Sequence, residues 1–387
     1  MIFRLVTTRI LLAAIFLIFA SAAWADLPDD DHAVSLQLFH PLATPGDPAA
    51  SASVRLSLLF ARSHSITAVD LNAGVAINSG HTRGLQMTGL YNQVGGRFQG
   101  LGFTGGVQHL RTNGSGLLFS GGVNHIEGSF NGFQMAGLLN HTSSGFAGGQ
   151  ISGVANLNDG AGSFLQLASV ANVNAGPFGG FQISAFLNAS LQVSSGAQLA
   201  LFNFADVMHG FQFGVINLTR VFNGVQVGVV NFSRENNGTP IGLVNLSDGN
   251  RREWLFSANT LSLANVGFRS VVNGWTSVVS FGAGDNKGDV KESYFASWHY
   301  GHQIIERSKW SLALDAGFVH IIPTKSENPL DNDSLHYALE ARLLGDWHLS
   351  ESVGVFATAG LSSVYDHYST NAPKQTDALF AGGIVLK

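Results

Sequence analysis

Three copies of one motif decide the fold: GFQFGVIN (Gly210–Asn217), GVQVGVVN (Gly224–Asn231) and GTPIGLVN (Gly238–Asn245). These copies stand 14 residues apart, and upstream of them glutamines and asparagines recur every 16 residues. A fixed period over so many copies indicates a repeat architecture before any local structure is predicted. The ladder positions that carry the repeat are Gln134, Asn140, Gln150, Asn156, Gln166, Asn172, Gln212, Asn217, Gln226, Asn231 and Asn245.

Each repeat is a short run of Val, Ile, Leu and Phe followed by a polar, Gly-rich connector, which is the pattern of a strand and a turn. Two architectures fit so short a unit: a β-solenoid with one coil per repeat, or an antiparallel meander with one strand per repeat. Because the motif runs in the same direction in every copy, a parallel stack places like residues about 4.8 Å apart. Their amides can then form hydrogen-bonded ladders. A meander would scramble these ladders, so the repeats favour the solenoid.

The repeat has one irregularity. Gln and Asn are six residues apart in the 16-residue repeats but five apart in the 14-residue repeats. Side chains alternate faces along a strand, so either one of the two residues changes face or a bulge absorbs the difference. In GVQVGVVN the first three valines share one face, opposite Gln226. We expect the larger apolar face to point inward, which predicts that Val227 and Phe213 are buried against protein.

The composition excludes several classes of protein. The chain has 387 residues with Gly 47, no cysteine and a net charge of −5. The glycines follow no strict every-third pattern, which excludes collagen, and the apolar content is too high for a disordered chain. Nucleic acid is not an expected partner, because binding it needs a basic face. Without cysteine there is no disulfide framework, thiolate metal site or lipoprotein anchor.

The first residues have the pattern of a secretory signal peptide. Two arginines precede an apolar run, and Ala23-Trp24-Ala25 suits cleavage before Asp26. We therefore expect residues 1–25 to be removed. No later stretch is apolar for the roughly 18 residues that a membrane-spanning helix needs, so membrane insertion would require a barrel. The expected location is the outer membrane or cell surface of a Gram-negative bacterium, with the periplasm as the alternative.

The repeat array, at 66–250, has a different region on each side. Residues 26–65 are predicted to form an acidic leader and a β-hairpin of strands 34–39 and 54–60. Residues 251–387 alternate longer strands with short turns and long polar loops, a layout typical of outer-membrane barrels. Six strands are predicted there: Thr276–Gly282, Tyr294–Ile305, Trp310–Ile321, Tyr337–Leu349, Val353–Tyr365 and Ala378–Leu386.

Six strands fall short of the minimum of eight for such a barrel. The N-terminal hairpin is the candidate for the missing pair, while LFSANTLSLAN and VGFRSVVN, which follow the array, are interpreted as loose echoes of the repeat. The fold prediction is therefore all-β: a repeat solenoid flanked by an N-terminal hairpin and a C-terminal antiparallel, barrel-like region. A soluble periplasmic β-domain is the alternative for the C-terminal region.

Three histidines directly follow ladder positions. His109, His125 and His141 should stack as three rungs on the surface. Imidazole is a common ligand of zinc and copper, which makes this stack a weak candidate metal site. Polar residues that simply occupy a coil corner are the favoured interpretation, because no carboxylate keeps the same register.

The sequence contains no catalytic constellation. Gly100–Gly105 matches the dinucleotide fingerprint G-x-G-x-x-G, but that fingerprint requires a strand followed by a helix, and here it falls in an all-β repeat. An enzyme with a cleft along the solenoid would need a cluster of carboxylates on neighbouring coils, and none is present. We expect no enzymatic activity and no cofactor.

The G-[FVL]-Q-x-G-x-x-N units resemble a family of Gram-negative secreted proteins described only as surface repeat-containing. The resemblance covers most of the chain after residue 25, including FHPLATPG (Phe39–Gly46) and PIGLV (Pro240–Val244). It implies a location in the cell envelope and no biochemical activity, so no functional residues carry over.

The resulting hypothesis is a non-enzymatic, outer-membrane-associated protein with a structural or binding role. Its expected partners are outer-membrane lipid and an unidentified surface ligand or protein. The alternative is an outer-membrane barrel for transport, in which the repeats are membrane strands.

Overall fold

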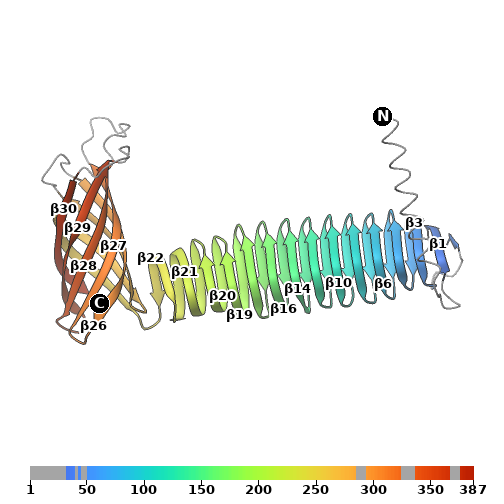
Figure 1. The fold of residues 1–387 in the computed structure, drawn as a ribbon, viewed down its shortest axis with the longest axis horizontal. Coiled ribbons are helices and arrows are strands. Elements are labelled where there is room, and N and C mark those ends of the chain that lie inside the picture. The colour runs from blue at the N-terminus through green and yellow to red at the C-terminus, as the bar shows by residue number, and fades with distance from the viewer. Residues whose placement is uncertain (1–31, 40–41, 45–49, 285–292, 324–335, 367–374) are drawn as a thin grey trace. The chain divides into compact units, whose positions relative to one another are not determined.

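The computed structural model describes all residues except 1–31, 40–41, 45–49, 285–292, 324–335 and 367–374. The predicted signal peptide therefore lies outside the described residues. By contacts the chain forms two compact units, residues 1–200 and 201–387. The fold is all-β, with a parallel solenoid of about 13 turns and a closed antiparallel barrel (Figure 1). No helix among the described residues is long and apolar enough to cross a membrane.

Each regular coil of the first unit contributes one long and one short strand to two parallel sheets, in which like residues pair between coils. The long strands are β4 (Ile66–Asn72), β6 (Thr82–Thr88), β8 (Phe98–Thr104), β10 (Gly114–Ser120), β12 (Phe130–Ala136), β14 (Gly145–Ser152), β16 (Ala161–Ala168) and β18 (Phe178–Ser184). The short strands are β5 (Val75–Asn78), β7 (Tyr91–Val94), β9 (Val107–Leu110), β11 (Val123–Ile126), β13 (Leu139–Thr142), β15 (Ala155–Asn158) and β17 (Ala171–Asn174), and β19 (Leu187–Leu199) ends the unit.

The N-terminal strands belong to the solenoid, so the predicted hairpin of 34–39 with 54–60 is wrong. Strands β1 (His32–Phe39) and β3 (Ala52–Ser63) pair in parallel, as successive coils do. The antiparallel partner of β1 is the short strand β2 (Leu42–Thr44). In this first part of the stack, Arg55 and Asp70 form a completely buried ion pair, with Nε 2.8 Å from Oδ1. The ion pair continues the polar interior to this end of the solenoid.

The second unit begins with coils and ends with a barrel. Its coil strands are β20 (Phe202–Phe213), β21 (Ile216–Asn236) and β22 (Thr239–Ser247). The barrel strands are β23 (Arg251–Asn259), β24 (Ala264–Val272), β25 (Trp275–Gly284), β26 (Ser293–Glu306), β27 (Trp310–Pro323), β28 (His336–His348), β29 (Val353–Asp366) and β30 (Gln375–Leu386).

The two barrel strands that the sequence analysis missed are β23 and β24. They occupy the stretch interpreted above as echoes of the repeat, and β23 pairs with both β24 and β30 to close the barrel. The N-terminal hairpin is therefore not needed for closure. Each is nine residues long, and single strands this short resemble a repeat strand when their partners are unknown.

The last coil is covered by the outer wall of the barrel. Trp298 Nε1 donates to Gly242 O at 3.2 Å, and Tyr300 Oη donates to Pro240 O at 3.0 Å. Ser277 Oγ also donates to Gly242 O, at 2.6 Å. An exposed edge strand invites pairing with other chains, and the barrel covers the edge that β22 would otherwise present.

The one-residue difference in Gln-to-Asn spacing between the 16-residue and 14-residue coils is accommodated at a corner of the coil. In the 16-residue coils a small inward residue, such as Ala136, lies between the glutamine strand and the Gly-containing turn. The 14-residue coils lack this residue: Phe213 is followed directly by Gly214. Gln212 and Asn217 consequently both remain buried. Neither of the predicted solutions, a change of face or a bulge, is used.

Candidate functional site

The predicted ladder residues form two columns of hydrogen-bonded amides inside the coils. Asn140 Nδ2 donates to Asn156 Oδ1 at 2.8 Å and to Ile151 O at 2.8 Å. Gln166 Nε2 donates to Gln150 Oε1 at 2.8 Å, so this column runs in the opposite direction. The other predicted members, Gln134, Asn172, Gln212, Asn217, Gln226, Asn231 and Asn245, are likewise buried. Amides that satisfy one another in this way can fill an interior without water.

The residues beside these amides point outward and are apolar. Gln226 is completely buried, whereas its neighbour Val225 is 36% exposed. Phe213 is 53% exposed and Val227 is half-buried, so the prediction that both are buried against protein is wrong. Stacked amides lose little free energy on burial when their hydrogen bonds are made. Once they take the interior, alternation places their apolar neighbours outside.

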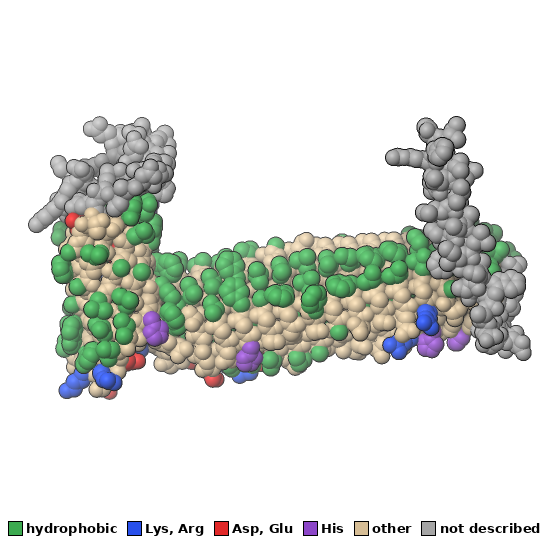
Figure 2. Space-filling model, in the orientation of Figure 1, with side chains coloured by type: hydrophobic (Ala, Val, Ile, Leu, Met, Phe, Trp, Pro, Cys, Tyr) green, Lys and Arg blue, Asp and Glu red, His purple; other side chains and the backbone are tan. Residues whose placement is uncertain are grey.

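In both units the outward apolar residues gather at the corner that follows each Gln position. We call this corner the apolar edge. It comprises Met87, Leu90, Phe103, Leu138, Val154, Leu167, Val170 and Phe186 in the first unit, and Phe213, Val215, Val229 and Leu243 in the second. Figure 2 shows hydrophobic side chains gathered along one edge of the coils within each unit. Contiguous exposed apolar surface of this kind marks an interaction surface.

Exposed charges lie at the opposite corner of the coils, which we call the charged edge. It comprises Arg97, Arg111, Glu127 and Asp159 in the first unit, and Arg220, Arg234, Glu235 and Asp248 in the second. One of its ion pairs joins Arg220 Nε to Asp206 Oδ1 at 2.7 Å. The coils of each unit are therefore amphipathic across their width.

A shallow groove of about 910 Å³ runs beside the apolar edge of the first unit. Its apolar walls are formed by Met87, Phe103, Phe119, Met135 and Ile151, one from each of five successive coils. Glycines of the corner, such as Gly105 and Gly121, also line it. The groove is a continuous apolar channel along the stack rather than a closed pocket for a small molecule.

The barrel wall is apolar on its outer face. The most exposed hydrophobic side chains there include Phe281, Leu361 and Phe380, at 66%, 59% and 59%. The lumen is ionic instead. Arg269 contacts both Glu253, with Nε 2.6 Å from Oε2, and Asp346, with Nη2 2.8 Å from Oδ1.

The lumen contains two further pairs. Arg342 Nη2 lies 2.8 Å from Asp315 Oδ2, and His299 Nε2 lies 2.9 Å from Glu340 Oε2. These side chains leave an enclosed cavity of only about 40 Å³ in the lumen, room for a few water molecules at most. Charged and polar side chains therefore occupy much of the described part of the lumen.

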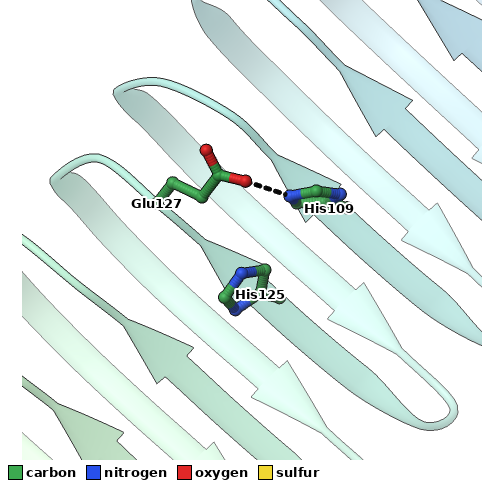
Figure 3. A group of neighbouring side chains, drawn as sticks. All are labelled: His109, His125 and Glu127. Carbon is green, nitrogen blue, oxygen red and sulfur yellow. Dashed lines mark hydrogen bonds and ion pairs between the residues drawn. The ribbon is translucent and has the colours of Figure 1, made fainter.

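The predicted histidine ladder is present on the strands of the short-strand sheet, and Figure 3 shows two of its members, His109 and His125, with Glu127. His109, His125 and His141 pair in register between coils, and their ring centroids are 5.0 Å apart at each step. His109 Nε2 lies 2.8 Å from Glu127 Oε1, and His141 Nε2 lies 3.0 Å from Asp159 Oδ2.

These two carboxylates were missed by the sequence analysis, which found no acidic residue in the histidine register. Glu127 and Asp159 each lie 18 residues after their histidine, one 16-residue coil plus two positions. The signal was therefore available, but at an offset that only the coil geometry makes meaningful. The structure brings His109, His125 and Glu127 together with ligand atoms within 4.8 Å of one another.

The protonation state of this cluster follows from its surroundings. Burial lowers the pKa of His125, and the neighbouring His109 and His141 lower it further. The hydrogen bond from His109 lowers the pKa of Glu127. At neutral pH the cluster therefore offers a neutral imidazole beside a carboxylate, the forms that bind metal ions.

The remaining sequence motif carries no site. Gly100 and Gly102 lie within strand β8 and Gly105 in the turn after it, and no helix begins there. No family model, no curated protein and no solved structure matches this chain.

Proposed function

We propose that this chain is a non-enzymatic structural protein of the Gram-negative outer membrane. In this proposal the barrel crosses the bilayer as an anchor, and the coils of the second unit lie along the periplasmic leaflet with their apolar edge among the acyl chains. The observation that carries the proposal is the inversion of the coils: Gln212 and Gln226 are buried, while Phe213 and Val225 are exposed.

The barrel supports the anchoring role because its polarity is that of a membrane protein. An outer-membrane barrel presents an apolar band to lipid and keeps polar groups inside, as Phe281 and Arg269 do here. The connections at 273–274, 307–309 and 349–352 are short and share one end of the barrel, whereas the sequence segments at the other end are mostly longer. Short turns are typical of the periplasmic end.

The same barrel argues against transport. An eight-stranded barrel is just wide enough for its interior to be filled by side chains, and the pairs Arg269–Asp346 and Arg342–Asp315 occupy this one. The repeat strands form coils with parallel pairing, and the barrel closes without them. The proposed barrel is an anchor and not a channel.

The depth of the last coil supports contact with lipid. Asn273, in the short turn after β24, donates to Gly238 O at 3.2 Å, while Gly242 O bonds Trp298 higher on the wall. His302 pairs with Trp275, which directly follows the turn at 273–274. Trp298 lies on the same strand, four residues farther from that turn. At ~3.4 Å per residue and a strand tilt of ~40°, this places the apolar edge roughly 10 Å above the turns. That height is within one leaflet of an apolar band about 25 Å tall.

Transfer of the edge from water to hydrocarbon is strongly favourable. Its named members are between about one-third and two-thirds exposed. A fully exposed Leu or Phe gains about 1.5–3 kcal/mol on burial, so partial exposure yields ~1 kcal/mol for each residue and on the order of 4 kcal/mol for the edge residues of the second unit. The opposite, charged edge would remain in water, because the coil is amphipathic across its width.

Single-cysteine spin labels test this proposal, since the chain contains no cysteine. Three variants of the full chain in liposomes are compared: Phe281→Cys on the barrel wall, Phe213→Cys on the apolar edge and Glu235→Cys on the charged edge. We expect oxygen to relax the labels at 281 and 213 more than a water-soluble nickel complex does, with the reverse order at 235. The label position is the only difference among the three variants.

The three labels separate the two parts of the proposal. Greater accessibility of residue 281 to the nickel complex would overturn the membrane barrel. A lipid-protected 281 with a water-accessible 213 would leave the anchor in place and overturn the embedded edge.

A further inference from the structure

We propose that the histidine ladder binds a divalent transition-metal ion of the zinc class through His109, His125 and Glu127, with His141 and Asp159 positioning His125. This site is independent of the membrane role, because it rests on side chains outside the apolar edge. Two imidazole nitrogens and one carboxylate oxygen are the ligand set of open zinc sites, in which water takes the fourth position. Zinc is the reference ion for the argument and for the test.

The hydrogen bonds leave His125 with a free lone pair. A neutral imidazole carries one N–H. His141 donates its own N–H at Nε2 to Asp159. Its Nδ1 is therefore unprotonated and accepts a hydrogen bond from His125 Nδ1 at 3.0 Å. The unprotonated nitrogen of His125 is then Nε2, for which no hydrogen bond is found among the described residues.

This arrangement is that of a metal-binding histidine with its supporting shell. A metal-ligating imidazole generally donates its second N–H to a fixed acceptor, which orients the ring and raises its basicity. Here the acceptor is His141, which is itself fixed by Asp159. His141 and Asp159 are therefore positioning residues and not ligands.

The second histidine of the proposed site, His109, lies against the carboxylate of Glu127. Tyr91 Oη lies 3.1 Å from His109 Nδ1 and holds that side of the ring by a hydrogen bond. On the other side of the ring, His109 Nε2 donates a hydrogen bond to Glu127 Oε1 at 2.8 Å. A metal ion would take the place of this proton between the two atoms and would also engage His125.

The distances allow the site to form with small movements. One ring nitrogen of each histidine and one Glu127 oxygen lie within 4.8 Å of one another, whereas the edge of a tetrahedron with bonds of 2.0–2.1 Å is roughly 3.3 Å. The carboxylate is the most movable ligand, because the Glu127 side chain is 45% exposed and that of His109 is 19% exposed. The histidine backbones are fixed by the parallel pairing of β9, β11 and β13.

Isothermal titration with ZnCl2 tests the site on the full chain in detergent, carrying a purification tag without histidine. We expect saturable binding of one ion per chain. His125→Ala and Glu127→Gln should each weaken binding at least 10-fold, and His141→Ala should weaken it about 10-fold through loss of orientation. His209→Ala, at an exposed histidine outside the ladder, is the matched control and should bind like the unmodified chain.

A second measurement identifies the ligands independently of affinity. X-ray absorption of the zinc-loaded chain should show two imidazole nitrogens, reduced to one in His125→Ala, while circular dichroism confirms that each variant is folded. Glu127→Asp should retain binding, because it keeps the carboxylate. Absence of saturable binding, or binding that His125→Ala and Glu127→Gln leave unchanged, would overturn the proposal.

Discussion

Gln212 and Phe213 are neighbours in the chain and lie on opposite sides of the coil wall. Gln212 is completely buried, and Phe213 is 53% exposed. The same exchange of an amide and an apolar side chain recurs at Gln226 and its neighbours. It gives the solenoid a column of buried amides beside buried rings such as Phe222, and an apolar rim. The same polarity is found in the barrel, where Arg269 is buried in the lumen and Phe281 faces outward.

The inversion predicts that two phenylalanines nine residues apart respond differently to the same substitution. Phe222 is completely buried in the second unit, whereas Phe213 lies on the apolar edge. Phe222→Ser should cost about 3–5 kcal/mol of unfolding free energy in detergent through lost burial and a cavity. Phe213→Ser should cost less than about 1 kcal/mol. Guanidinium unfolding followed by circular dichroism measures both, and equal losses would contradict the assigned faces.

The asparagine column predicts a cost for removing one amide. Asn231 accepts from Asn217 and donates to Asn245, each at 2.8 Å. Asn231→Leu keeps the size but leaves buried partners unsatisfied, which should cost about 1–3 kcal/mol. Glu235→Ala, on the charged edge and outside the column, should change stability by less than about 0.5 kcal/mol. The midpoint of thermal unfolding compares them, and equal midpoints would show that the column contributes nothing.

The barrel lumen predicts a large effect at Arg269. This guanidinium is shared by Glu253 and Asp346, and all three groups are buried. Arg269→Met removes the cation and leaves two carboxylates without it, at a cost of about 3–5 kcal/mol. The measurement is the temperature at which the detergent-folded barrel changes its gel mobility. Arg307→Met, at an exposed position in a turn, is the control and should leave that temperature unchanged.

The close stacking of coils predicts that Gly132 cannot carry a side chain. Its φ is 134°, and a Cβ built there would lie 2.0 Å from Gly116 O in the preceding coil. Gly132→Ala should destabilise the chain by roughly 2–4 kcal/mol through backbone strain and overpacking. Asn131→Ala, at the exposed neighbouring position, serves as the control in the same unfolding experiment. A Gly132→Ala chain as stable as Asn131→Ala would show that the coils separate easily at this step.

Several features of the candidate sites were predictable because they depend only on the repeat. Asn140 and Asn156 were expected to stack, and so were His109 and His125, since a fixed period in a parallel stack places like residues beside each other. The partners of these residues were harder to predict. His109 meets Glu127 around a coil corner, and Arg269 meets Asp346 across the barrel, 77 residues away. Such contacts depend on the turns between strands and on the closure of the barrel, and neither produces a periodic pattern in the sequence.

The sequence by itself determined the solenoid and its register, because period and strand length are properties of the chain. Only the tertiary structure decided which face of each strand is inside. Alternation places Gln226 and Val225 on opposite faces but does not say which face is inside. The usual preference for apolar interiors predicted the apolar face inside, and that prediction was wrong. The amides can take the interior because the next coil supplies their hydrogen-bond partners, and those partners exist only once the coils have stacked.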